Sequence, residues 1–267
     1  MNSRQVLVVD AGHTRIKFAL CQENSPKELP QVVEFVAPMC GSEIPWESIA
    51  GWISPEAAAC ENLITGSNPQ AIELVRQNWP AALGSPRLLV DRTQLPLQIQ
   101  VAEPARVGID RLLTALAANQ LRTPGQMAVI VDTGTAITVD SINSNGAFLG
   151  GAILPGVRMG SQALHRYTAT LPEIDASLMF DAMPNPIGTC THAAIESGLY
   201  WGHVGSVREL IHQQLEELDG QQEPEPLVLM TGGASPLLKP HFANARFEPY
   251  LALQGLAVVA LARKRRA

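Results

Sequence analysis

Short runs of apolar residues, each closed by an aspartate and a glycine, are the clearest feature of the hydrophobic pattern. Residues 6–10 and 127–131 form two such runs, and their length and β-branched content predict buried strands. A strand at 16–21 is expected to pair with the first run in a hairpin. After the second run, a turn at 143–146 leads to a predicted strand at 148–154.

Helical periodicity marks three longer segments. Residues 109–121 carry apolar side chains at positions i, i+3 and i+4, and residues 191–218 keep the same period, with Thr191 as the expected N-cap. Residues 251–266 form the expected closing helix. The other expected elements are alternating helix and strand over 57–91 with a strand at 88–90, a polar connector at 220–226, a strand at 227–230 and a glycine turn at 231–235.

The Asp-x-Gly turn occurs twice, at a separation of about half the chain. Residues 6–12 and 128–134 each place an aspartate at a strand end, a glycine two positions later and another strand beyond. One such turn would mean little, because both residue types are common turn formers. Two of them predict an α/β protein made of two duplicated halves, residues 1–122 and 123–267, with a cleft between the halves.

Three glycines interrupt the long predicted helix of the second half. Gly198, Gly202 and Gly205 lie on nearly one face, and each costs roughly 1 kcal/mol of helix stability relative to alanine. Such a face suggests that another backbone packs closely against it, and a second subunit is one candidate.

Composition excludes several classes of protein. The 267 residues are 46% apolar and 16% charged, which excludes a disordered chain. The net charge of −6 argues against nucleic-acid binding, which needs a basic surface. The longest apolar stretch, 250–262, is too short to span a bilayer. The apolar run near the N-terminus is too short for a signal peptide. We therefore expect a cytoplasmic protein without a membrane partner. The cysteines at 21, 40, 60 and 190 form no Cys-x-x-Cys pair and are expected as reduced, mostly buried thiols.

The first hairpin carries residues suited to phosphate chemistry. Glycine lets backbone N–H groups approach phosphate oxygens, and a carboxylate such as Asp10 holds Mg²⁺ directly or through water. Thr14 adds a hydroxyl, and Lys17 has the charge needed to neutralise a transferring phosphoryl group. The same residues also fit an ordinary hairpin with a surface lysine.

A second candidate pair opens the helix at 109–121. At that place Asp110 could accept a proton from a hydroxyl nucleophile, and Arg111 could bind a carboxylate substrate through two hydrogen bonds. An alternative is structural, because an aspartate in the first turn interacts favourably with the helix dipole and an exposed arginine forms surface ion pairs.

The ordered set of motifs resembles the type III pantothenate kinase family, from residue 6 to residue 256. The family belongs to the superfamily of acetate and sugar kinases, Hsp70 and actin, so the resemblance implies two ribonuclease H-like, actin-like ATPase halves. The matching motifs are Asp10-x-Gly-x-Thr with Lys17, Gly108-x-Asp110-Arg111, Asp132-x-Gly134-Thr135-Ala-x-Thr, Gly150-Gly-x-Ile-x-Pro155-Gly156, Ile187-Gly188-x-x-Thr191, Thr231-Gly-Gly233 and Pro249-x-Leu-x-Leu-x-Gly255-Leu.

The resemblance implies ATP-dependent phosphorylation of pantothenate to 4′-phosphopantothenate, the first step of coenzyme A synthesis, by a homodimer. Asp110 would be the general base, Asp10 would lie near Mg²⁺, and Asp132 would hold the required monovalent cation, K⁺ or NH₄⁺. The implied ATP-binding residues are Asp10, Ala11, Gly12, His13, Thr14, Arg15, Ile16, Lys17 and Thr135. The implied pantothenate-binding residues are Gly108, Ile109, Asp110, Arg111 and Thr191.

The chain departs from the family pattern at three positions. His13 and Cys190 each stand where the family usually has asparagine, and Val101 stands where a tyrosine is common. Two alternatives therefore stay open beside pantothenate phosphorylation. One is a kinase of another small hydroxylated acid, and the other is a nucleotide-binding regulator without turnover.

Overall fold

The computed structural model forms two compact units. It describes residues 4–25, 28–53, 61–175, 179, 182–218 and 224–263. The first unit comprises Met1–Leu121 together with Tyr250–Ala267, and the second comprises Arg122–Pro249. The division falls beside the boundary expected after residue 122, but the closing segment belongs to the first unit, whereas the sequence had suggested the second.

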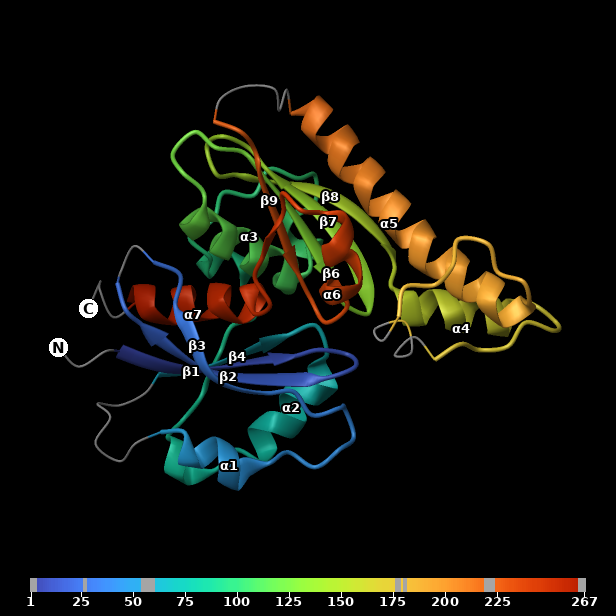
Figure 1. Cartoon of the computed structure of the whole chain (residues 1–267). Coiled ribbons are helices and arrows are strands. Elements are labelled where there is room, and N and C mark those ends of the chain that lie inside the picture. Colours follow the sequence, from blue (N-terminus) through green and yellow to red (C-terminus); the bar gives the residue numbers. More distant parts are fainter. Residues whose placement is uncertain are drawn as a thin grey trace. The chain divides into compact units, whose positions relative to one another are not determined.

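The first unit is a five-stranded sheet with helices on both faces (Figure 1). The strand order is β3-β2-β1-β4-β5, in which β1 runs antiparallel to β2 and parallel to β4. Its elements are β1 (Arg4–Ala11), β2 (Ile16–Glu23), β3 (Gln31–Val36), α1 (Trp46–Gly51), β4 (Glu61–Gly66), α2 (Pro69–Gln77), β5 (Arg87–Leu88), α3 (Ile109–Leu121) and α7 (Leu251–Arg263), with short 3-10 turns at Ala81–Leu83, Arg92–Gln94 and Pro104–Arg106.

The alternation of side chains along β1 decides which residues reach the candidate site. Leu7, Val9 and Ala11 pack into a core cluster with side chains of α1 and α2. Because successive strand residues point to opposite faces, Val8 and Asp10 point to the other face of the sheet. That face is covered by α7, which also packs along α3.

Helix α7 joins the first unit through a close approach of two helix backbones. A Cβ atom built on Gly255 would overlap the backbone carbonyl of Leu113 in α3. Only glycine permits this approach, so α7 lies directly against the helix that carries Asp110. Gln254 also donates a hydrogen bond from Nε2 to the carbonyl of Pro30 at 3.0 Å, between segments that lie more than 200 residues apart in the sequence.

The second unit repeats the topology of the first. Its strand order β10-β9-β6-β7-β8 matches that of the first sheet, with β6 antiparallel to β7 and parallel to β9. The two duplicated ribonuclease H-like α/β halves expected from the sequence are confirmed. The elements are β6 (Ala128–Thr133), β7 (Ala136–Ile142), β8 (Phe148–Pro155), α4 (Val157–Tyr167), α5 (Thr191–Glu217), β9 (Leu227–Thr231), α6 (Ser235–Leu238) and β10 (Arg246–Phe247), with a 3-10 turn at Lys239–His241.

Most elements expected from periodicity are present. Three expectations from the sequence need correction: one N-cap, one strand and the burial of the cysteines. The N-cap of α5 is Cys190, not Thr191, because Thr191 already has helical backbone geometry at the first position of the helix. Of the strand expected at 88–90, only Leu88 lies in a strand, because β5 spans Arg87–Leu88. Of the thiols expected to be mostly buried, Cys21 is buried, Cys40 is half-buried and Cys190 is exposed.

Parts of other predicted elements, at 57–60, 220–223 and 264–266, lie outside the described residues. Within the described part of the chain, no helix combines the length and apolar character needed to cross a bilayer.

Candidate functional site

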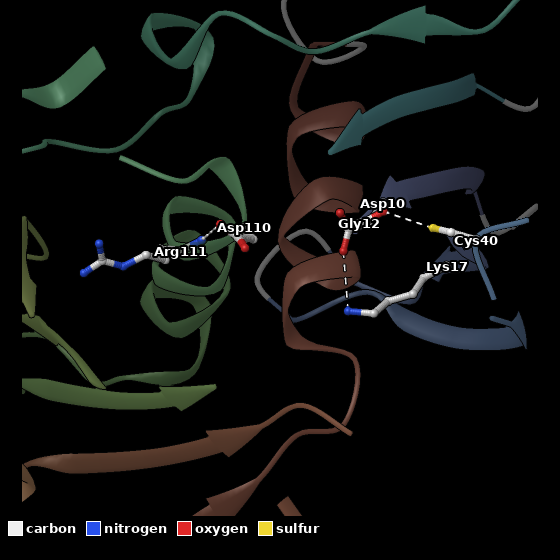
Figure 2. A network of polar contacts seen from close by, with 6 residues as sticks. All are labelled: Asp10, Gly12, Lys17, Cys40, Asp110 and Arg111. Carbon is white, nitrogen blue, oxygen red and sulfur yellow. Dashed lines mark hydrogen bonds and ion pairs between the residues drawn. The ribbon is translucent and has the colours of Figure 1, made fainter. Parts of the chain in front are cut away.

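The β1–β2 hairpin places Asp10 and Lys17 opposite each other. The two residues are direct partners in the antiparallel register, so both side chains lie on the sheet face away from α1 and α2. Lys17 Nζ lies 3.5 Å from Asp10 Oδ2, at the outer limit of a hydrogen bond (Figure 2). The lysine side chain is 42% exposed and the aspartate side chain 11% exposed, so a ligand can reach the ammonium group while the carboxylate stays protected from water.

Burial raises the pKa of the Asp10 carboxyl, because desolvation disfavours its charged form. Lys17 acts in the opposite direction, and the charge of the Asp110 carboxylate raises the pKa further. The first unit therefore brings two carboxylates close enough to interact electrostatically, although exactly one hundred residues separate them in the sequence. A cation placed beside them would offset both the desolvation and the repulsion, so Asp10 fits the role of a residue beside Mg²⁺.

Two buried side chains flank the turn of the hairpin, and the residues of the turn itself are exposed or half-buried. Gly12 N donates to the carbonyl of Arg15 at 3.1 Å, which closes the turn. Ala11 and Ile16 are buried, so any contact that they make with ATP must come from their backbone atoms. His13 is exposed, and the guanidinium of Arg15 donates to the carbonyl of Ala37 at 2.9 Å.

Asp110 lies in the first turn of α3 and is held by its local backbone. Its Oδ1 accepts a hydrogen bond from the backbone N–H of Arg111 at 2.9 Å, and Figure 2 shows the Arg111 guanidinium extending away from this carboxylate. A Cβ atom at position 108 would overlap Asp110 Oδ1, so glycine there makes room for the carboxylate. Ile109 is buried in the core. Gly108 and Asp110 thus form one local unit, with the acid near the helix start.

In the second unit, Asp132 occupies the position that Asp10 has in the first. It is half-buried near the end of β6, and its strand partner is Thr138. Gly232 has φ of +93°, and a Cβ atom built on it would lie 2.5 Å from Asp132 Oδ1. Gly134 N donates to the carbonyl of Ala136 at 3.0 Å, as Gly12 does to Arg15. The Asp132 carboxylate and the Thr133 backbone thus pack so closely against position 232 that only glycine fits there.

Thr135 and Thr191 are exposed in the second unit. The Thr135 carbonyl accepts a hydrogen bond from Gly156 N at 3.1 Å, and Thr191 starts α5. A cavity of about 330 Å³ lies beside the first turns of α5. It is lined by Met179, Ala182, Met183, Pro184, Asn185, Ile187, Thr189, Ala193 and Glu196, and not by Thr191.

The sites predicted from the sequence thus fall into two groups. Asp10, Lys17 and Asp110 meet in the first unit, whereas Asp132, Thr135 and Thr191 belong to the second. Sequence reasoning missed two residues that bind the first hairpin, Cys40 and Asn68. A signal for Asn68 was present, since Asn-Pro before an amphipathic segment is a helix start pattern.

Comparison with known proteins agrees with these motifs. The family model for type III pantothenate kinase matches residues 6–213. The type III pantothenate kinase of Gluconobacter oxydans is 34% identical over 261 residues, which cover 96% of this chain and 92% of that protein. The enzyme of the same name from Ruegeria is 30% identical over 94% of each chain.

Among solved structures, a conserved Baf family protein from Campylobacter jejuni superimposes with a TM-score of 0.59. The two sequences are 16% identical, and the match covers 97% of this chain and 100% of that one. This likeness shows a shared fold. The family model and the curated relatives together show that the chain belongs to the type III pantothenate kinase family.

Proposed function

We propose that this chain transfers the γ-phosphoryl group of ATP to the primary hydroxyl of pantothenate, which gives 4′-phosphopantothenate in the first step of coenzyme A synthesis. The observation that carries the proposal is the pairing of Lys17 Nζ with Asp10 Oδ2 at 3.5 Å in a chain of this family, in the same unit as Asp110, whose charge acts on the Asp10 carboxyl. These residues supply the negative and positive charges that phosphoryl transfer uses for positioning and charge neutralisation. A cytoplasmic location stays a prediction.

Asp110 is the proposed general base. As the hydroxyl oxygen of pantothenate bonds to the γ-phosphorus, its proton moves to the Asp110 carboxylate, and the bond from phosphorus to the bridging oxygen breaks to release ADP. The N–H of Arg111 holds Oδ1 of the base at 2.9 Å, which fixes its direction. The Arg111 guanidinium, directed away from this carboxylate in Figure 2, has the geometry to bind the carboxylate of pantothenate with two hydrogen bonds, and Thr191 is proposed to bind the same substrate.

The hairpin residues are proposed to bind the phosphates of ATP. Lys17 brings a partly exposed ammonium group toward them, and the turn offers backbone N–H groups. Mg²⁺ bound with ATP would neutralise phosphate charge, and the buried Asp10 carboxylate would favour it there. Thr135 is the corresponding proposed phosphate contact on the second unit.

Asp132 is proposed to hold the monovalent cation. Carboxylate oxygens suit hard cations, and Asp132 is the counterpart of Asp10 on the central strand of the second sheet. The cation would balance charge near the phosphates, while Asp132 keeps it in place. The choice between K⁺ and NH₄⁺ is open to titration with each salt.

The homodimer is proposed from the glycine face of α5. Among the described residues, a Cβ atom built on Gly198, Gly202 or Gly205 would meet nothing within 4 Å, so this face has room for the close packing of a second copy. We expect light scattering to give twice the chain mass of 28.7 kDa for the wild type and the single chain mass for Gly202→Leu. A monomeric wild type, or a dimeric and folded variant, would contradict this assembly.

An acceptor comparison tests the substrate. Initial rates of ADP release are measured with pantothenate, pantoate and glycerate, each at several concentrations with saturating ATP, Mg²⁺ and K⁺. The proposal expects kcat/KM to be highest for pantothenate by at least about 100-fold, since a site built to bind polar groups rejects substrates that leave those groups unpaired. A higher kcat/KM for pantoate or glycerate would favour the alternative that the chain is a kinase of another small hydroxylated acid. ATP binding without turnover of any acceptor would favour the regulator.

A further inference from the structure

The carbonyl oxygen of Gly12 accepts hydrogen bonds from two side chains that come from separate segments. Cys40 Sγ lies 3.3 Å from this oxygen, in the segment after β3, and Asn68 Nδ2 lies 3.4 Å from it, just before α2. Figure 2 shows the thiol of Cys40 directed at the Gly12 backbone. A carbonyl oxygen has two lone pairs, so these two donors together saturate it.

The same two residues also bind the hairpin through their backbone. Cys40 N donates to the carbonyl of Thr14 at 2.9 Å, and Asn68 N donates to the carbonyl of Ala11 at 3.1 Å. Each residue therefore makes one backbone and one side-chain bond to the turn. These four hydrogen bonds hold the carbonyl oxygens of Ala11, Gly12 and Thr14 and so restrict the rotation of their peptide planes.

The direction of the Gly12 carbonyl determines the direction of the next N–H group. A trans peptide is planar, so the N–H of His13 points opposite to the Gly12 carbonyl. With the oxygen held toward Cys40 and Asn68, this N–H points away from them, at a position where the His13 side chain is exposed. Successive backbone N–H groups directed outward from a turn are an anion-binding arrangement.

We propose that Asn68 and Cys40 are positioning residues for ATP, because they hold the Gly12 carbonyl and thereby direct the His13 N–H toward a phosphate oxygen. This inference rests on the proposed phosphate-binding role of the hairpin. Neither residue needs to touch the nucleotide. Their effect should therefore appear in ATP affinity and not in the affinity for pantothenate.

Asn68 also caps α2, and the two roles can be separated. Its Oδ1 accepts hydrogen bonds from the backbone N–H groups of Gln70 and Ala71 at 3.1 and 3.2 Å. Its Nδ2 donates to the Gly12 carbonyl. Serine is as good an N-cap as asparagine but has no amide that reaches Gly12. Asn68→Ser therefore keeps the helix start, adds no charge and removes only the bond to the turn.

The other end of α2 offers a matched control. Asn78 follows the helix, and its Nδ2 donates to the carbonyl of Leu74 at 2.9 Å. Asn78→Ser makes the same chemical change and also removes a side-chain bond to a backbone carbonyl. It lies nine residues after the start of α2, and its hydrogen bonds go to carbonyls within the helix and not to the turn, so ATP binding should not change.

The experiment measures the ATP dissociation constant by calorimetry and the KM values for ATP and pantothenate by ADP release. For Asn68→Ser we expect ATP affinity to fall about fivefold, as for loss of one ordinary hydrogen bond, with kcat at saturating ATP and the KM for pantothenate unchanged. Asn78→Ser should match the wild type. Equal ATP affinities for the two variants would overturn the positioning role.

A second pair keeps the test valid if Asn68→Ser does not fold. Cys40→Ala removes the thiol donor and should weaken ATP binding, whereas Cys40→Ser keeps a donor and should restore most of the affinity. A Cys40→Ala protein that binds ATP like the wild type would contradict the proposal. Wild-type protein without turnover would contradict the proposed function instead, and calorimetry would still test the positioning of the turn.

Discussion

The two halves of the chain share a strand order and a glycine turn, and they differ in what stands opposite the aspartate at the strand end. In the first half, Asp10 faces Lys17 across the hairpin, whereas in the second Asp132 faces Thr138. A lysine supplies a positive charge where phosphate oxygens approach, whereas threonine supplies an uncharged hydroxyl. The first hairpin thus adds a positive charge that suits an anion, whereas in the second hairpin the strand-end aspartate faces an uncharged hydroxyl.

The loops that support the two hairpins differ in the same way. Asn68 N donates to the Ala11 carbonyl at 3.1 Å, and Ala234 N donates to the Thr133 carbonyl at 3.0 Å, so the backbone contact is duplicated. Only Asn68 adds an amide that binds the carbonyl of the turn glycine. The two halves therefore share the backbone hydrogen bond to the turn, and in the first half the Asn68 side chain adds a second hydrogen bond.

The largest expected effect is that of Asp110→Asn, which removes the proposed base from the first half. Asparagine keeps the size of the side chain but cannot take a proton, so kcat should fall about 10³-fold while ATP affinity is retained. Steady-state rates and calorimetry measure the two quantities. Asp91→Asn is the matched control, because Asp91 is an exposed cap where asparagine serves equally well. Normal turnover by the Asp110 variant would show that another group is the base.

Lys17→Thr makes the first hairpin resemble the second and should have the next largest effect. Loss of the ammonium removes charge neutralisation at the phosphates, so kcat/KM for ATP should fall about 100-fold. Loss of the same charge raises the pKa of Asp10 further, and the acidic limb of the rate profile should move to higher pH. Lys239→Thr changes the same residue type in the second unit, where it lies over the Phe247 ring, and should leave both quantities unaltered.

Asp132→Asn tests the cation site of the second half. Removing the carboxylate should lower turnover about tenfold in K⁺ and raise the K⁺ concentration needed for half-maximal rate, since a negative ligand is lost. The rate is measured against K⁺ with Na⁺ keeping the ionic strength constant. Equal K⁺ dependence in the variant and the wild type would remove Asp132 from this role.

The smallest effect concerns stability. The folded state raises the pKa of Asp10 above the ordinary value of 3.8, so the folded protein binds the proton more tightly than the unfolded chain. The contribution of the Asp10 carboxyl to the free energy of unfolding is therefore fully present below its unfolded pKa. It is lost as the pH rises through its folded pKa. Asp10→Asn removes that loss, and at pH 7.5 it should raise the melting temperature by about 3 °C. A lower melting temperature at pH 7.5 would contradict the assigned burial cost.

Local pattern was enough to predict the elements that carry the site. The apolar runs of β1 and β6 are too short and too β-branched for helices, and the period of α3 gave its bounds correctly. The edge strand β3 escaped prediction because its apolar residues neither form an unbroken run nor alternate with polar residues, and most of its side chains are exposed. The placement of α7 in the first unit depends on contacts between residues more than 130 positions apart, such as Gly255 with Leu113, which no local pattern reports.

The candidate site likewise has residues that local sequence predicts and residues that only the folded unit brings together. Asp10 and Lys17 are close in the sequence, and hairpin geometry alone predicts that they face each other. Asp110 comes close enough to affect Asp10 only because side chains alternate along β1, α7 covers the corresponding face and α3 packs along α7, which requires the assembled unit. Cys40 and Asn68 carry no catalytic signature, and their contribution became visible through hydrogen bonds to one carbonyl oxygen.

The most direct test of the account is to incubate the purified protein with ATP, Mg²⁺, K⁺ and pantothenate and to identify the product by mass. The account predicts 4′-phosphopantothenate together with an equal amount of ADP, in a yield that falls when Na⁺ replaces K⁺. Absence of the phosphorylated product, with ATP bound and the protein folded, would contradict the assignment of pantothenate as the acceptor.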